Sequence, residues 1–399
     1  MIELSWGALG RLVAARARLG PDAGDDALLA AARSPRQKMA ALLTSARALE
    51  GEPMPAAWTD VLRRHQARTV FYSQHVDALT RQVPDVTVFK GQTLARDYPV
   101  GFVRGAGDVD LHCASVESQW HAARYLLDTG WYVKAFTLYA PRGNVPEAVV
   151  ALGHENIPCD SQAPGITLST SHLLTDLWSP PLALDGARSA RATSLVCLFA
   201  EQWERAVRTR DLVDYSVAMA SATRDDQADL IALTTHARTR HQWWRLRSLC
   251  RTAGLAVDDP GPGHAAGASD AAVRAIRAAR RRARPVRVAA HLAGWTVDDD
   301  RGVLFDAFSD WFHARVGVRR ALDAGMPAFG VESDDRRSPA LAVEHHHGQA
   351  VARTPLGSFR LVVGSCTDDA PTDVSLRAEA TAAAEGPIAT QNRAGRSAQ

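Results

Sequence analysis

Two aspartates, Asp108 and Asp110, are the residues whose types and spacing most directly indicate chemistry. They lie in the run DVDLHC at 108–113, where polar and apolar residues alternate as in a strand with one buried face. On such a strand both carboxylates project from the same face, about 7 Å apart, and repel each other unless a cation lies between them. Carboxylate oxygens are ligands that Mg²⁺ and Mn²⁺ prefer. We therefore expect Asp108 and Asp110 to bind a divalent metal, with a solvated strand face as the alternative.

A candidate phosphate-binding segment precedes the two aspartates. The β-branched and aromatic run at 86–89 predicts a strand that ends at Lys90-Gly91. A glycine at a strand end lets backbone N–H groups approach a phosphate closely, and the adjacent lysine supplies a positive charge. Arg104 adds a forked guanidinium that suits phosphate oxygens. The segment therefore offers a phosphate cradle followed by a carboxylate pair, although Lys90 taken alone would be an ordinary cation at a strand end.

The stretch Val88–Cys113 resembles the signature of a bacterial nucleotidyltransferase family in the DNA polymerase beta superfamily. The matching positions are Lys90-Gly91, Tyr98-Pro99, Arg104 and Gly107-Asp108-Val109-Asp110-Leu111. Farther along, Arg210–Asp214 is similar to a later helix of that family, which usually carries an aspartate. The resemblance covers roughly residues 57–220 and is specific only within Val88–Leu111.

The resemblance implies an enzyme that transfers a nucleotidyl group from a nucleoside triphosphate, with ATP expected, to an acceptor hydroxyl, phosphate or carboxylate. Asp108 and Asp110 would hold Mg²⁺ or Mn²⁺ and act in catalysis. Lys90 would also act in catalysis and, with Gly91 and Arg104, would bind the nucleotide. Many members of the family are associated with natural-product pathways, which implies a peptide or small-molecule acceptor.

One departure from the family pattern concerns a third carboxylate on a later strand, which a histidine follows. The corresponding segment, 165–172, keeps His172 but has no acid before it. Asp160 or Asp176 could substitute for that acid. A two-metal mechanism normally uses such a ligand. The departure therefore supports an alternative function, in which the fold serves as a non-catalytic peptide or protein recognition subunit.

The elements that must position these residues are predicted from hydrophobic patterning. A helix covers about residues 57–82, and Ser115 begins another that ends at Gly130. Strands are expected at 86–89, 108–113, 132–139 and 165–170. This pattern predicts an α+β fold in which a small mixed β-sheet, the nucleotidyltransferase core, is flanked by helical N-terminal and C-terminal regions.

Composition changes along the chain divide it into six parts. They are a helical N-terminal region (1–85), the nucleotidyltransferase core (86–180), a helical region packed on it (181–257), a linker rich in proline and glycine (258–269), a C-terminal α/β unit (270–376) and a disordered tail (377–399).

Composition also limits the partners that the protein can have. The 399 residues carry a formal net charge of only +2, so we do not expect nucleic acid as a partner. Lysine occurs only at 38, 90 and 134, so a lysine in a motif is stronger evidence for a functional role than one of the many arginines. Five widely spaced cysteines indicate neither a disulfide framework nor a zinc site. No membrane span or secretory signal is recognised, so a cytoplasmic protein with no membrane partner is expected.

Overall fold

The computed structural model describes residues 4–20, 22–139, 146–158, 165–172, 184, 189–203, 205–255, 318–319, 322, 328–334, 336–346 and 349–362. The expected linker (258–269) and tail (377–399) lie outside these residues, as do Asp160 and Asp176. Within the described ranges, no helix combines the length and apolar character that crossing a membrane requires.

The described strands form one mixed sheet of nine, in the order β1-β2-β5-β4-β3-β6-β9-β8-β7. Strands β2 and β5 run parallel, and the other neighbouring pairs are antiparallel. The strands are β1 Val86–Phe89, β2 Val109–Cys113, β3 Tyr132–Tyr139, β4 Glu147–Gly153, β5 Ile166–Ser169, β6 Ala328–Asp334, β7 Ala342–His346, β8 Gln349–Arg353 and β9 Ser358–Val362. The expected combination of helices with a mixed sheet is therefore confirmed, and the sheet is larger than the small one expected.

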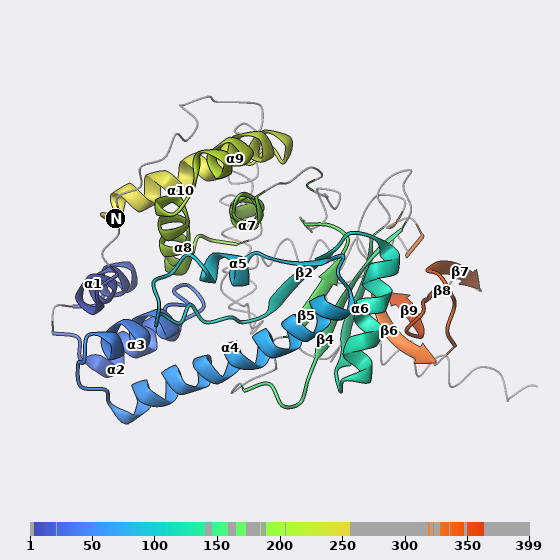
Figure 1. Cartoon of the computed structure of the whole chain (residues 1–399), viewed down its shortest axis with the longest axis horizontal. Coiled ribbons are helices and arrows are strands. Elements are labelled where there is room, and N and C mark those ends of the chain that lie inside the picture. Colours follow the sequence, from blue (N-terminus) through green and yellow to red (C-terminus); the bar gives the residue numbers. More distant parts are fainter. Residues whose placement is uncertain are drawn as a thin grey trace, which may run out of the picture.

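Helices pack on both sides of the β1–β2 end of the sheet. Figure 1 shows α4 and α6 along one side and α7–α10 gathered on the other. The helices are α1 Trp6–Ala17, α2 Asp25–Arg33, α3 Ala40–Leu49, α4 Ala56–Gln82, α5 Gly91–Ala95, α6 Val116–Asp128, α7 Ala190–Ala200, the 3-10 helix η1 Glu201–Trp203, α8 Thr209–Ala220, α9 Arg224–His236 and α10 Arg240–Thr252. Helices α1–α3 and the start of α4 share a separate core with α8.

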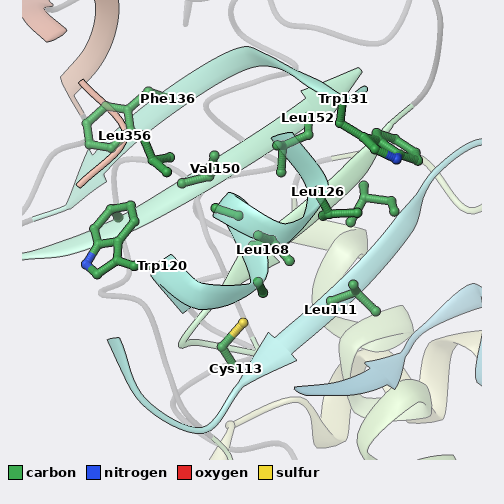
Figure 2. Close-up of a cluster of buried hydrophobic side chains, with 14 of the residues drawn as sticks. Leu111, Cys113, Trp120, Leu126, Trp131, Phe136, Val150, Leu152, Leu168 and Leu356 are labelled. Carbon is green, nitrogen blue, oxygen red and sulfur yellow. The ribbon is translucent and has the colours of Figure 1, made fainter. Parts of the chain in front are cut away.

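Strand β2 separates the hydrophobic core from the polar face that carries the aspartates. Val109, Leu111 and Cys113 are fully buried on the side of α4 and α6, as the alternating pattern predicts. Figure 2 shows Leu111 and Cys113 in this cluster with side chains of α6 and the neighbouring strands. The opposite face of β2 carries Asp110 and His112 and is only partly buried. Core packing thus fixes which way Asp110 points.

Strands β6–β9 extend the sheet beyond β3. Residues 136–138 of β3 pair with 328–330 of β6. The rings of Phe136 and Phe359 stack across this junction with centroids 4.4 Å apart. A Cβ atom on Gly330 would lie 2.6 Å from Phe136 Cδ1, so the stacked rings leave room only for glycine. Strands β6–β9, in the segment expected to form a C-terminal α/β unit, therefore belong to the same sheet as β1–β5.

Candidate functional site

The turn between β1 and α5 places Lys90 beside Asp110. Lys90 has φ 56° and ψ −126°, a backbone conformation that is uncommon for a residue with a side chain. The Thr93 hydroxyl donates a hydrogen bond to Val88 O at 3.0 Å and closes this turn. Phe89 pairs with Asp110 across the β1–β2 ladder. Lys90 Nζ consequently lies 3.3 Å from Asp110 Oδ2.

A cavity of about 420 Å³ lies at the face of the sheet that carries Asp110. All five residues predicted as site residues line it: Lys90, Gly91, Arg104, Asp108 and Asp110. The remaining lining residues come from the loop before α3, the Gly107 loop, α5, α7, η1, the segment between η1 and α8, and α8 itself. They are Lys38, Leu94, Gly107, Ser194, Leu198, Glu201, Arg205, Arg208, Arg210 and Asp211. Its size is within the usual range for small-molecule sites.

The two aspartates differ in environment. Asp108 precedes β2 and is exposed, whereas the side chain of Asp110 is 17% exposed. Burial raises the pKa of Asp110 to about 6, with Asp108 and Glu201 adding to the rise and Lys90 opposing it. Burial alone would lower the pKa of Lys90, but the nearby carboxylates of Asp110 and Glu201 outweigh it and raise the pKa above its usual range. At neutral pH the pair is therefore an ammonium facing a carboxylate.

Arg104 is held by a buried carboxylate. Its Nε and Nη2 donate to the two oxygens of Asp214 at 2.8 and 2.6 Å, and the Tyr98 hydroxyl donates to Asp214 Oδ1 at 2.7 Å. The third nitrogen, Nη1, faces Gly91, where an added Cβ would lie 2.5 Å from it. Two of the three nitrogens of Arg104 are thus used within the protein, and Nη1 is left beside the cavity.

Four further basic residues line the cavity and were not predicted from sequence: Lys38, Arg205, Arg208 and Arg210. Two backbone hydrogen bonds join the start of α8 to the loop before α3. In one, Thr209 N–H donates to Arg36 O at 3.2 Å; in the other, Arg210 N–H donates to Gln37 O at 3.1 Å. These bonds bring together residues that are about 170 positions apart in the chain. The scarcity of lysine is the one sequence signal that could have pointed to Lys38.

Arg205 neutralises the acids on the α7–α8 side of the cavity. Its guanidinium forms ion pairs with Glu201 and, at 2.6 Å, with Asp211 Oδ2. Asp211 also accepts a hydrogen bond from Arg208 N–H at 2.8 Å. Burial would raise the pKa of Glu201, but Arg205 and Lys90 lower it below its usual value. Glu201 and Asp211 are therefore held as ion-paired carboxylates.

Lys38 and Arg208 are the basic side chains least compensated by acids. Within the described ranges, no carboxylate forms an ion pair with either of them. Arg210 donates to Gly105 O at 3.1 Å, and its Nε lies 3.9 Å from Asp214 and makes no hydrogen bond. Partial burial, Arg208 and Arg210 together lower the pKa of Lys38 to about 8. The cavity lining holds six basic and four acidic residues, so it carries an excess of positive charge.

Strand β5 supplies no acid to the site. Thr167 is the residue that pairs with Asp110 in the parallel β2–β5 ladder. The His172 ring stacks on His112 with centroids 3.7 Å apart, and its Nδ1 accepts a hydrogen bond from Leu184 N–H at 3.2 Å. Burial and His112 lower the pKa of His172 to about 3. His172 is therefore a neutral, packed side chain.

The donor set around Asp110 suits a hard cation that completes its coordination with substrate. Across the described segments, no three His, Cys, Asp or Glu side chains gather at metal-binding distance. Mg²⁺ commonly binds to one or two carboxylates and takes its remaining ligands from phosphates and water. Asp108 and Asp110, both at the cavity and close enough for Asp108 to raise the pKa of Asp110, fit that arrangement.

Comparison of the chain with protein-family models, curated proteins and solved structures finds no match.

Proposed function

We propose that this protein is a nucleotidyltransferase that uses Mg²⁺ or Mn²⁺ and a nucleoside triphosphate, with ATP as the first candidate. The acceptor would be a peptide or small molecule of a natural-product pathway. One observation carries the proposal: Lys90, Gly91, Arg104, Asp108 and Asp110 line the same cavity. Chemistry on a triphosphate needs a phosphate-binding group next to a metal-binding group, and this cavity has candidates for both.

Each residue has a defined task in this proposal. The Lys90 ammonium lies beside Asp110 and would neutralise phosphate oxygens as a point charge. Asp214 fixes the Arg104 guanidinium, so that Nη1 can donate to a phosphate without reorganising. Gly91 leaves the space in which Nη1 sits. Positioning and charge stabilisation of this kind supply most of the rate in phosphoryl chemistry.

Asp108 and Asp110 would hold the metal. When bound there, Mg²⁺ would neutralise charge that develops on the phosphate oxygens. Asp110 is mostly ionised at neutral pH because its pKa is about 6, and Lys90 contacts only one of its oxygens. The other oxygen, together with the exposed Asp108, remains for a cation.

A peptide or protein recognition subunit is the second candidate function. Thr167, at the position on β5 that pairs with Asp110, favours it, because a threonine cannot supply a charged metal ligand there. The two functions differ in their need for a metal. A recognition subunit would bind its partner without nucleotide or Mg²⁺.

Calorimetric titration of the full chain with ATP, GTP, CTP and UTP, with and without Mg²⁺, tests the proposal. We expect binding of at least one nucleotide to depend on Mg²⁺. Asp108→Asn should weaken it on the order of tenfold or more, because an amide keeps the shape but loses the charge that attracts the cation. The melting temperature without metal should stay the same or rise slightly, since Asp108 is exposed and its repulsion of Asp110 is removed.

Asp85→Asn is the matched control, because Asp85 is also an exposed aspartate directly before a strand but lies outside the cavity. It should leave nucleotide binding unchanged. Nucleotide binding that is absent, or that ignores Mg²⁺, would reject the enzyme proposal in favour of the recognition subunit. Full binding with a lowered melting temperature in Asp108→Asn would show that Asp108 has a structural role.

A further inference from the structure

Among the described residues that line the cavity, none is free to act as the general base for a hydroxyl acceptor. An attacking hydroxyl must give up its proton to a base within hydrogen-bond reach. Of the four acids among the described lining residues, Asp108 and Asp110 are assigned to the metal, and Glu201 and Asp211 are ion-paired with Arg205. No histidine is part of this described lining. A nucleophile that is already ionised at neutral pH needs no such base.

The same cavity has cations that the triphosphate cradle does not use. Lys38 and Arg208 form no ion pair within the part of the chain that the structure describes, and both line the cavity. Arg210 lies next to them with its Nε buried and without a hydrogen bond. An arginine fork and a lysine together suit the oxygens of a carboxylate or phosphate.

These cations and the phosphate cradle come from different segments of the fold. Lys90 contacts Asp110, on β2 itself. Lys38 comes from the loop before α3 and lies near enough to Asp108 for its charge to act on the ammonium. In an in-line displacement, the attacking and leaving oxygens lie on opposite sides of the phosphorus, with the metal ligands near both. Cationic groups from two different parts of the fold, the β1–α5 turn and the loops before α3 and α8, would let separate groups bind the triphosphate and the acceptor.

We propose that Lys38 and Arg208 bind an oxyanion of the acceptor, a carboxylate or a phosphate, and that this oxyanion is the nucleophile. The inference rests on the proposed function and narrows its acceptor class by excluding a hydroxyl. An acceptor oxygen forms a bond to the α-phosphorus while the bond from that phosphorus to the bridging oxygen of the β-phosphate breaks. Pyrophosphate leaves with the electron pair, and the product is an anhydride. No proton has to be moved.

Binding of two simple anions to the full chain tests this site. Inorganic phosphate and acetate serve as probes, each titrated alone and in the presence of Mg²⁺ with the unreactive analogue α,β-methylene-ATP. We expect one or both anions to bind in both conditions. Lys38→Gln and Arg208→Gln should each weaken anion binding on the order of tenfold and change analogue binding less than about twofold. The anion that binds tighter identifies the acceptor group as phosphate or carboxylate.

Two variants serve as controls. Lys134→Gln removes the same charge from β3, outside the cavity lining, and should change neither titration. Lys90→Gln should weaken binding of the ATP analogue and leave binding of the anion probe unchanged. Melting temperatures of all variants identify any that fail to fold, and a single substitution at Lys38, which is exposed, should leave the fold intact.

Three outcomes are decisive. In the first, the anion and the analogue compete, and Lys38→Gln lowers the affinity for both equally. This result would assign these cations to the triphosphate and overturn the inference. Anion binding that is absent, or that does not change in Lys38→Gln and Arg208→Gln, would also overturn it. If the protein binds no nucleotide but binds an anion through both Lys38 and Arg208, the oxyanion site is supported. Only the nucleotidyltransferase proposal is then rejected.

Discussion

Lys90 and Asp110 show how two neighbouring residues set each other's protonation. Asp110 is on the partly buried face of β2, where burial favours its neutral form, and Lys90 counters this at 3.3 Å. Because the pKa of Asp110 is raised to about 6, its charge is lost at a higher pH than that of an ordinary aspartate. We therefore expect the affinity for a metal at this site to change with pH near pH 6.

Mg²⁺-dependent nucleotide binding should fall steeply below pH 6. The metal needs the carboxylate form of Asp110, so protons compete with it as the pH drops through about 6. Affinity should be constant between pH 7 and 8 and should drop about tenfold for each unit well below 6. Titration at half-unit steps from pH 5 to 8 measures this. Constant affinity down to pH 5 would mean that Asp110 does not hold the metal.

Gly91→Ala should weaken nucleotide binding while the protein stays folded. The added Cβ would lie 2.5 Å from Arg104 Nη1, so the guanidinium must shift or rotate away from the cavity. We expect a loss on the order of tenfold in nucleotide affinity, equivalent to one charge-assisted hydrogen bond. Gly107→Ala is the control, since Gly107 lines the same cavity and its added Cβ meets no atom within 4 Å. Equal effects from both substitutions would contradict the role given to Nη1.

Helix α8 connects the N-terminal helices to the site. Asp214 of α8 accepts hydrogen bonds from Arg104 and Tyr98, while the start of the same helix is bonded to the loop that carries Lys38. Asp214 is fully buried. Burial would raise the pKa of Asp214, but Arg104 and Arg210 hold it below its usual value, so the network contains a buried charge. The position of α8 thus sets the positions of Arg104 and of the loop that carries Lys38, and both residues line the cavity.

Asp214→Asn should lower the free energy of unfolding by roughly 3–5 kcal/mol, because it leaves the Arg104 guanidinium buried without its carboxylate. Tyr98→Phe removes one neutral donor from the same carboxylate and should cost only about 0.5–1.5 kcal/mol. Urea unfolding of both variants measures the difference. Similar values for the two would show that the charge of Asp214 adds little beyond its hydrogen bonds.

Local pattern explains which elements could be predicted from sequence. Strands β1 and β3 have the predicted bounds, and Ser115 caps α6 as expected, because alternation and capping are properties of neighbouring residues. Strand β4 (Glu147–Gly153) was missed, since it is buried on both faces and shows no alternation. Lys38 and Arg208 were missed for another reason: a contact between distant segments leaves no local pattern.

The sheet is built from two distant parts of the chain, β1–β5 within residues 86–169 and β6–β9 within residues 328–362. Strand β3 pairs with β4 on one side and with β6 on the other, so the C-terminal strands cover what would otherwise be an edge. Phe136 is 1% exposed because β6 and β9 lie against it. The C-terminal strands therefore contribute to the stability of the strands that carry the site.

A chain that ends at residue 257 should be much less stable than the full protein and should aggregate. It would lack β6–β9, leaving the edge of β3 unpaired and Phe136 in water. Thermal unfolding and size-exclusion chromatography measure both effects. A chain ending at 376 is the control, because it keeps every described strand and removes only the predicted tail. A monomeric 1–257 chain with an unchanged melting temperature would show that the C-terminal strands are a separate unit.

The pairing of β3 with β6 also has a consequence for synthesis on the ribosome. Phe136 and its partner Gly330 are about 190 positions apart, so β3 is made long before the strand that covers it. At 5–20 residues per second, translation takes roughly 10–40 s to reach β6. During that interval the nascent chain presents an uncovered apolar strand edge, which is a binding site for chaperones and for other unfinished chains. The yield of native protein in a cell should therefore depend on translation speed and chaperone supply.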